Sequence, residues 1–380
     1  MPYDIKLDAP LVGISTSIAL EGETAAIQTR GFFCSDEPAL LSKVLDGFWS
    51  SILARLPAGA VPSPSHVRHA LAVILKDGST TVWVNDLAIQ AQVLSRRPVE
   101  KGEPVTADDI ADVRSVTLGV EIPPDAGFAF VYENRWERAY FFDFGPLATG
   151  VARAFDVSAE LGAQKTYLLH RERCRLTDEE WAGLLSQDWF PFILLPQRTL
   201  DLMFGLLRAG RSVDLVLNDI SAAVEARLPT FLSGMEAKPA LAAQIPFIER
   251  AIEHFRNGDF LSSVSVLFPR IEGIWRGIAR PAGSVPHKAL ATTVVEAGAT
   301  RLSPVSPLLA GGFLDYLKTR FLPKFDPGRP EGLTRHTVSH GVASAEEFSR
   351  KGALLGLLIV NQLRYFVTAD AEEPPGGSER

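Results

Sequence analysis

The chain has 380 residues, of which 46% are hydrophobic and 22% are charged, with 38 Lys and Arg against 45 Asp and Glu. This much apolar material can build more than one core, which excludes disorder for most of the chain and indicates about two or three domains. The formal charge of −7 excludes a surface that is basic throughout but leaves room for a local basic patch.

Cysteine content and hydropathy narrow the class of protein. Cys34 and Cys174 are too few for a disulfide framework or for a cysteine-based zinc site. The first residues (MPYDIK) lack the apolar run of a signal peptide, and the longest apolar run, Ala353–Val360, is far shorter than the roughly 20 residues that cross a bilayer. We therefore expect a cytoplasmic protein without a membrane segment.

Residues 1–170 are rich in short runs that are typical of strands. The runs Thr80–Val84 (TTVWV), Gly127–Tyr132 (GFAFVY) and Arg138–Phe144 (RAYFFDF) combine β-branched and aromatic residues. The residues KDGS before Thr80 are typical of a tight turn and separate it from the apolar run Ala70–Leu75. These runs predict antiparallel strands.

Two helical signals accompany these strands. Between Glu37 and Leu56, apolar residues recur at helical spacing and predict a helix. The residues TADD at 106–109 have the pattern of a capping box and predict a second, short helix. Together, strands and helices predict a β-rich, mixed α+β domain over residues 1–170.

The hydrophobic period becomes helical after Thr177. The residues TDEE at 177–180 are an N-cap signature, and prolines separate the segments that follow. Helices are predicted at about 177–185, 200–207, 213–228, 245–256, 260–279, 308–321 and 333–366, the last with a candidate break near Gly341.

These patterns predict four regions: an α+β domain (1–170), a helical connector (171–244), an all-α helical-bundle domain (245–366) and a disordered, acidic tail (367–380). Charge separates them as well. Residues 245–366 hold 15 Lys and Arg against 10 Asp and Glu, whereas residues 1–240 hold 22 against 31. The basic surplus of the C-terminal region suggests that the two regions have different partners, or at least different surfaces.

The segment Leu333–Gly341 (LTRHTVSHG) holds the most chemically suggestive residues of the chain. Arg335 and His340 have an R-x4-H spacing, and His336 and His340 are four residues apart. On a regular helix, two residues at this spacing share a face. A helix start or a bend near Gly341 would let all three side chains meet at one site.

Three interpretations of this motif remain open. In an acid–base site for a phosphodiester, the histidines would exchange protons near neutral pH and the arginine would bind phosphate oxygens. In a metal site, His336 and His340 would be ligands on one helical turn, although the HExxH pattern of zinc peptidases is absent. In a structural interpretation, the three side chains only connect helices.

The residues Arg335–Gly341 (RHTVSHG) resemble the R-x4–6-H signature of the HEPN superfamily of helical domains. Upstream, Val266–Arg276 (VLFPRIEGIWR) is similar to the PxIEgilR helix of bacterial HEPN-like proteins of the defence and abortive-infection type. Downstream, Glu346–Leu355 (EEFSRKGALL) resembles the closing helix of that family. The resemblance covers about residues 245–366 and does not extend to the first 240.

The resemblance implies a role for each matching residue. In catalytic HEPN proteins, the motif cuts RNA without a metal, and the ribose 2′-OH is the nucleophile. Arg335 would then stabilise the phosphate and the transition state, and His340 would be the general acid or base. His336 occupies a position that is commonly Asn or Asp in the family. Glu272 matches a recurrent acidic position that orients the motif, although a salt bridge that only packs two helices is an equal alternative.

Further basic residues flank the motif and could line a phosphate-binding groove. They are Arg276, Lys318, Arg320, Lys324, Arg350 and Lys351. As a solvated helix face they need no function, so the groove is a hypothesis.

The sequence thus predicts a metal-independent RNA endonuclease or toxin-like defence effector that needs no cofactor. The resemblance implies that its R-x4-H site forms at the two-fold interface of a homodimer. The N-terminal domain would sense a trigger or restrain the nuclease. The alternative is a non-catalytic HEPN-type scaffold that binds RNA or protein, and a third, weaker interpretation is a metal-binding enzyme.

Overall fold

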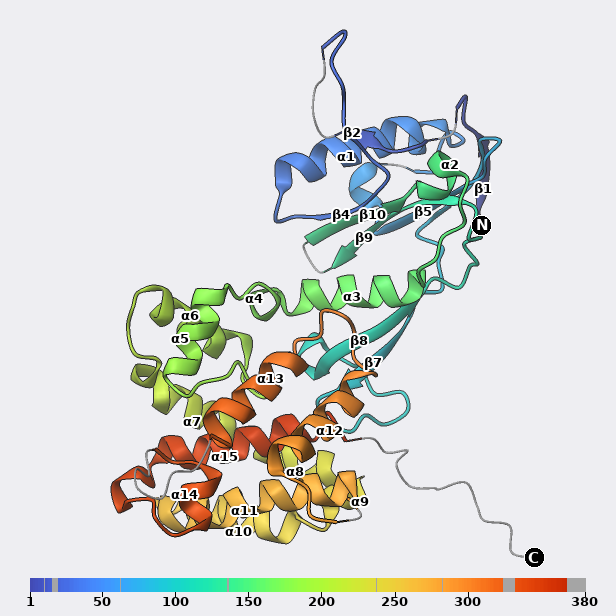
Figure 1. Ribbon diagram of the computed structural model, residues 1–380. Coiled ribbons are helices and arrows are strands. Elements are labelled where there is room, and N and C mark those ends of the chain that lie inside the picture. Colours follow the sequence, from blue (N-terminus) through green and yellow to red (C-terminus); the bar gives the residue numbers. More distant parts are fainter. Residues whose placement is uncertain are drawn as a thin grey trace, which may run out of the picture. The chain divides into compact units, whose positions relative to one another are not determined.

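The computed structural model describes residues 1–9, 11–15, 20–61, 63–134, 137–236, 238–281, 283–323 and 332–367. The chain divides into two compact units, one of Met1–Ala91 with Ser115–Gln164 and one of Gln92–Arg114 with the chain from Lys165 onward. We call them the sheet unit and the helical unit (Figure 1). The predicted α+β class is confirmed, because an antiparallel sheet region precedes a helical region. The predicted disordered tail lies, apart from Val367, outside the described residues.

The sheet unit is built on one antiparallel sheet of six strands in the order β1-β6-β5-β9-β10-β4. These strands are β1 (Tyr3–Lys6), β4 (Arg30–Cys34), β5 (His69–Ile74), β6 (Ser79–Val84), β9 (Gly127–Asn134) and β10 (Glu137–Asp143). The remaining elements are the small pair β2 (Ile14–Ser15) and β3 (Ile27–Gln28), helices α1 (Pro38–Ser51) and α2 (Gly145–Thr149), and the 3-10 turns Leu53–Arg55 and Pro64–His66.

The strands and the first helix predicted from the sequence are present in this unit. The strand runs coincide with β5, β6, β9 and β10, although the runs ending at Leu75 and Phe144 each extend one residue beyond their strand, and the predicted turn before β6 contains Gly78 with a φ of 84°. Helix α1 ends at Ser51, a little before the predicted end. Its apolar face covers one face of the sheet, where Phe48 packs against Tyr140 with ring centroids 5.7 Å apart. Alternating apolar residues on the strands and the apolar stripe of α1 thus form one core.

Two elements are shared between the units. The ribbon of β7 (Gln90–Ser95) and β8 (Ile110–Thr117) and the helix α3 (Val157–Leu169) each cross from one unit into the other. The predicted capping box at 106–109 forms a 3-10 turn, Ala107–Asp109, in which the Asp109 carboxylate accepts a hydrogen bond from the Thr106 backbone N–H at 2.8 Å.

The helical unit contains the remaining elements. They are α4 (Arg171–Cys174), α5 (Asp178–Ser186), α6 (Gln197–Arg208), α7 (Leu217–Glu225), α8 (Leu228–Glu236), α9 (Pro239–Ala242), α10 (Ile245–Arg256), α11 (Phe260–Ala279), α12 (His287–Ala299), α13 (Ala310–Tyr316), α14 (Arg335–Ser339) and α15 (Arg350–Leu363), with 3-10 turns at Val213–Val216 and Ala345–Glu347 and a π-helical turn at Leu317–Phe321.

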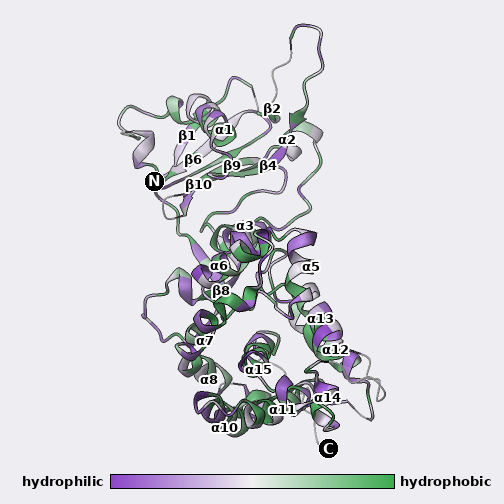
Figure 2. Ribbon diagram, turned by 90° about the vertical axis from the view of Figure 1, so that its left-hand side faces the viewer, coloured by the Kyte–Doolittle hydropathy of each residue, from purple (hydrophilic) through white to green (hydrophobic). Residues whose placement is uncertain are grey.

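Helix α15 is the centre of the helical unit. Almost all of its residues are buried, which fits the apolar run ALLGLLIV in its sequence. In Figure 2 it runs through the middle of the unit, surrounded by α7, α8, α11 and α12. Within the described part of the chain, none of the helices has both the length and the hydropathy that a bilayer crossing requires.

The two units follow boundaries that differ from the expected ones. The segment 171–244 shares one hydrophobic core with residues 245–367 and is not a separate connector. Buried Gln362 shows this directly, because its side-chain oxygen accepts the Ile193 backbone N–H at 2.9 Å and its amide donates to the Leu308 carbonyl at 3.0 Å.

Buried Asp112 explains why part of the β7–β8 ribbon belongs to the helical unit. Its carboxylate accepts hydrogen bonds from the Thr166 hydroxyl at 2.9 Å, from the Ser303 hydroxyl at 2.7 Å and from the Ser303 backbone N–H at 2.9 Å. A buried carboxylate needs such partners, so the ribbon is tied to the segments that supply them. No periodicity in residues 92–114 predicts this tie.

Candidate functional site

The predicted motif lies on the short helix α14 and on the turn that ends it. Thr334 caps this helix: its hydroxyl accepts the Thr337 backbone N–H at 3.1 Å, while the Thr337 hydroxyl accepts the Thr334 backbone N–H at 2.9 Å. The helix ends at His340, and Gly341 follows with a φ of 67°, which glycine adopts without strain. The expected break near Gly341 is confirmed, and it leaves His340 exposed.

The two motif histidines lie on the same side of α14, as their spacing predicts. The ring centroids of His336 and His340 are 6.2 Å apart, and the rings are nearly parallel. His336 also faces His287, the first residue of α12, with ring centroids 5.6 Å apart. His336 and His287 are half-buried, so the three imidazoles extend from the interior to the surface.

Glu272, on α11, joins these elements. Its Oε1 lies 2.8 Å from Arg276 Nε, one turn further along the same helix, and 2.9 Å from His287 Nε2 on α12. Its Oε2 accepts a hydrogen bond from Arg335 Nη2 on α14. The single carboxylate therefore holds three helices together, and we call these six side chains (Glu272, Arg276, His287, Arg335, His336, His340) the Glu272 cluster.

The positive charge of the Glu272 cluster exceeds its negative charge. The Glu272 side chain is 11% exposed and that of Arg335 is 15% exposed, whereas Arg276 reaches solvent. One carboxylate thus faces two permanently charged guanidinium groups. In addition, the Nε of Arg335 is buried and has no hydrogen-bond partner among the described residues. A site of this kind attracts an anion.

The cluster shifts the pKa of two of its members downward. Burial by itself raises the pKa of Glu272, but the hydrogen bond from Arg276 and the charges of Arg335, His287 and Arg276 outweigh it, so Glu272 stays ionised. Burial lowers the pKa of His336, and the charge of Arg335 lowers it further. His336 is therefore neutral near pH 7 and suited to accept a proton.

The predicted residues Glu272, Arg335, His336 and His340 thus come together, and Arg276 joins them. Sequence reasoning missed His287, which stands alone after Pro286 with no spacing that relates it to the motif. Only the packing of α12 beside α11 brings its ring to Glu272. The two arginines of the cluster offer positive charge to anionic oxygens, and its imidazoles are groups of the kind that exchange protons near neutral pH.

Two of the basic residues predicted to line a groove, Arg350 and Lys351, have contacts elsewhere. Arg350 donates to the Asn218 side-chain oxygen at 2.8 Å, and Lys351 lies 2.8 Å from an Asp214 carboxylate oxygen. These contacts connect the start of α15 to α7 and to the turn before it.

The remaining groove candidates lie around the π-helical turn Leu317–Phe321. Arg320 lies 3.6 Å from the Asp188 carboxylate, and Lys318 is half-buried on the same turn. Lys324 lies outside the described residues. Of the five described residues, therefore, only Arg276 takes part in the Glu272 cluster.

The second interpretation of the motif was a metal site with His336 and His340 as ligands. Within the described ranges, no group of three or more His, Cys, Asp and Glu side chains is arranged to hold a metal ion. Among the described residues, therefore, His336 and His340 have no third side chain placed to complete a metal site with them.

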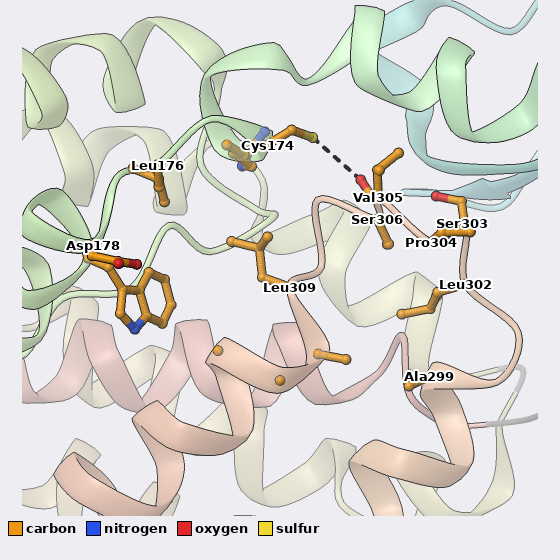
Figure 3. Close-up of a pocket in the computed structure, with 15 residues that line it drawn as sticks. Cys174, Leu176, Asp178, Ala299, Leu302, Ser303, Pro304, Val305, Ser306 and Leu309 are labelled. Carbon is orange, nitrogen blue, oxygen red and sulfur yellow. Dashed lines mark hydrogen bonds between the residues drawn. The ribbon is translucent and has the colours of Figure 1, made fainter. Parts of the chain in front are cut away.

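A separate cavity of about 700 Å³ lies in the helical unit, between the segments 173–181 and 299–312 (Figure 3). Leu176, Leu302 and Leu309 form part of its wall, and the Cys174 thiol donates to the Val305 carbonyl at 3.4 Å. Burial raises the pKa of Cys174 to about 11, so the thiol stays protonated near neutral pH and is a poor nucleophile.

Comparison with known proteins adds no relative. No family model, curated protein or solved structure matches this chain.

Proposed function

We propose that the chain is a metal-independent RNA endonuclease of the HEPN type that acts in the cytoplasm as a toxin-like defence effector. The observation that carries the proposal is the Glu272 cluster, in which the motif arginine and both motif histidines meet and His340 is exposed. The resemblance of residues 245–366 to HEPN domains supports the choice of RNA as substrate.

Arg335 binds the scissile phosphate in this proposal. Its guanidinium is planar and permanently charged, which suits the non-bridging oxygens of a phosphodiester and the charge that grows on them in the transition state. Glu272 is a positioning residue, because it holds Arg335 from the side of α11. The excess positive charge of the cluster attracts the RNA backbone.

The histidines move the protons. His336, neutral because of its lowered pKa, accepts the proton of the ribose 2′-OH as the O2′–P bond forms. His340 donates a proton to the 5′-oxygen as the P–O5′ bond breaks. The products are a 2′,3′-cyclic phosphate and a 5′-hydroxyl, so no metal, oxidant or external nucleophile is consumed.

The proposal includes an assembly and a regulator. Two copies of the helical unit would form an isologous dimer that brings two motifs together at one site. The sheet unit would sense a trigger or restrain the nuclease until the trigger binds.

A second candidate is a non-catalytic scaffold that binds RNA or protein. The burial of Arg335 against Glu272 favours it, because a guanidinium already paired with a carboxylate has less capacity for a phosphate. The exposure of His340 favours the nuclease instead.

Incubation of the full-length protein with mixed RNA in EDTA separates these candidates. We expect cleavage by the wild type, and a loss of about a hundredfold or more in His340→Ala, since proton transfer by a positioned side chain contributes about that much. His254→Ala is the matched control, because His254 also lies in the helical unit but is half-buried and pairs with Asp259. Its cleavage rate should equal that of the wild type.

Three other outcomes would each contradict a part of the proposal: the nuclease activity, its independence of metal, or its site. RNA binding without cleavage supports the scaffold. Cleavage that requires a divalent metal supports the metal-binding interpretation, which uses His336 and His340. Cleavage in EDTA that survives in His340→Ala places the activity at another site.

A further inference from the structure

A second cationic site lies in the helical unit, away from the Glu272 cluster in sequence. A cavity of about 270 Å³ is lined by residues of the β7–β8 ribbon, of the α7–α8 segment and of the end of α15. Figure 1 shows these elements. Its charged lining residues are Arg96, Arg97, Asp108, Asp109, Arg227 and Arg364. Four arginines and two aspartates thus share one small cavity.

Arg364 is the most deeply buried of these arginines, at 3% exposure. Its Nη1 donates to the carbonyls of Thr230 and Phe231, at 3.2 and 3.1 Å. Its Nη2 donates to the Tyr365 hydroxyl at 2.6 Å and also to the Arg96 carbonyl. All of these acceptors are neutral, so the hydrogen bonds orient the guanidinium without cancelling its charge.

Arg96 and Arg227 add two more charges, and neither forms an ion pair with a carboxylate of the described residues. Arg96 Nε donates to the Ile110 carbonyl at 3.2 Å. Burial lowers the pKa of Arg96, and the charges of Arg227 and Arg364 lower it further against the opposing effects of Tyr365 and Asp108. The side chain of Arg227 forms no hydrogen bond or ion pair with the described residues, and Arg227 is one of the residues that line the cavity.

The aspartates do not balance these charges. Asp109 is already paired with Arg97, whose Nε lies 2.6 Å from its carboxylate, and Arg97 also pairs with Glu103, which does not line the cavity. Asp108 alone remains to face Arg96, Arg227 and Arg364. Arg96, Arg227 and Arg364 therefore exceed Asp108 by two positive charges, which come from three segments that are far apart in the sequence.

We propose that this cavity binds a small molecule through a phosphate group, with Arg96 and Arg227 as its ligands and Arg364 behind them. A phosphomonoester carries about −1.5 to −2 charges at pH 7, which matches the excess of the cavity. One guanidinium group can donate two parallel hydrogen bonds to the oxygens of one phosphate group. Ligand pockets usually start at about 300 Å³, so a cavity of 270 Å³ suits a phosphate group or a small phosphate ester.

The test is calorimetric titration of the full-length protein with inorganic phosphate, adenosine 5′-monophosphate and adenosine, in chloride buffer of constant ionic strength. Arg227→Gln should weaken phosphate-dependent binding by on the order of tenfold, because it removes a charge-assisted hydrogen bond. Asp108→Asn should strengthen it, because it removes the opposing carboxylate. Arg211→Gln is the matched control, since Arg211 is exposed in the same unit and does not line the cavity.

The two ligand arms distinguish the source of the phosphate. Tighter binding of the nucleotide than of inorganic phosphate identifies a phosphate ester as the ligand, and equal binding identifies free phosphate. The proposal is overturned if neither binds, if adenosine binds as well as its monophosphate, or if Arg227→Gln and Asp108→Asn leave the affinity unchanged. The opposite signs of the two variants keep the test decisive even where one of them folds poorly. None of these outcomes depends on whether the protein cleaves RNA, so this test is independent of the proposed nuclease activity.

Discussion

Two buried carboxylate–arginine pairs, one in each unit, differ in their charge balance. In the sheet unit, Asp143 and Arg153 are 5% and 2% exposed, and the Arg153 Nε lies 2.6 Å from the carboxylate. The rest of that guanidinium donates to backbone carbonyls and lies over the ring of Phe128. In the helical unit, Glu272 pairs with Arg335 but also contacts Arg276 and His287.

The difference separates a structural ion pair from a candidate site. The Asp143 pair is neutral as a whole, and its two side chains are almost closed to solvent. The Glu272 cluster keeps an excess of positive charge and extends to the exposed ring of His340. Burial alone is thus a poor guide to function; a charge that the protein leaves without compensation is a better one.

The largest expected loss of stability follows from breaking the Asp143–Arg153 ion pair. Asp143→Asn leaves Arg153 buried without a counter-ion, and loss of one partner of such a pair costs about 3–5 kcal/mol. Urea unfolding of the wild type and the variant, followed by circular dichroism, measures this cost. A loss below about 1 kcal/mol would contradict the view that the pair is closed to solvent.

Glu272→Gln should cost less, about 2 kcal/mol, because Arg276 and His287 are partly exposed and water can compensate them. The same urea experiment measures it. RNA cleavage should fall as well, since Arg335 loses its positioning residue. A variant as active as the wild type would show that Glu272 only packs helices.

Loss of the cap of α14 should have a smaller effect. Thr334→Ala removes the hydroxyl that accepts the Thr337 backbone N–H and should cost about 1 kcal/mol, as N-cap substitutions do. Ser344→Ala at the exposed cap of the turn Ala345–Glu347 is the matched control and should cost less. Equal costs at the two caps would show that the motif helix has no special need for its cap.

The smallest effect is a dependence of stability on pH. The folded-state pKa of His336 lies below its ordinary value of 6.5, so its contribution to stability is complete above that value and is lost as the pH falls from 6.5 toward the folded-state pKa. His336→Gln should flatten this slope, which urea midpoints between about pH 8 and about pH 5.5 would reveal. An unchanged slope would place the titrating group elsewhere.

Local patterns predicted the elements that depend on neighbouring residues. Four strands of the six-stranded sheet (β5, β6, β9 and β10), helix α1, the capping box at 106–109 and the break at Gly341 follow from period, caps and turn residues, whereas β1 and β4 were not predicted. The i,i+4 spacing placed His336 and His340 on one side of α14. The pairing of Glu272 with the motif was anticipated only through the resemblance to HEPN domains.

Features that depend on contacts between distant segments were not predictable in the same way. The attachment of residues 92–114 to the helical unit rests on Asp112 and Ser303, which are far apart in the sequence. The contacts of Arg350 and Lys351 with α7 and the turn before it have the same origin. A hydrophobic period states which face is buried but not against which segment.

The sequence by itself determined the α+β class, the order of sheet and helices, and the local geometry of the Arg335–Gly341 motif, because these depend on residues a few positions apart. The tertiary structure decided which charges meet. It brought His287 to Glu272, gathered Arg96, Arg227 and Arg364 around one cavity, and left both sites with more positive than negative charge. Electrostatic balance is a property of distances in space, and spacing along the chain does not encode it.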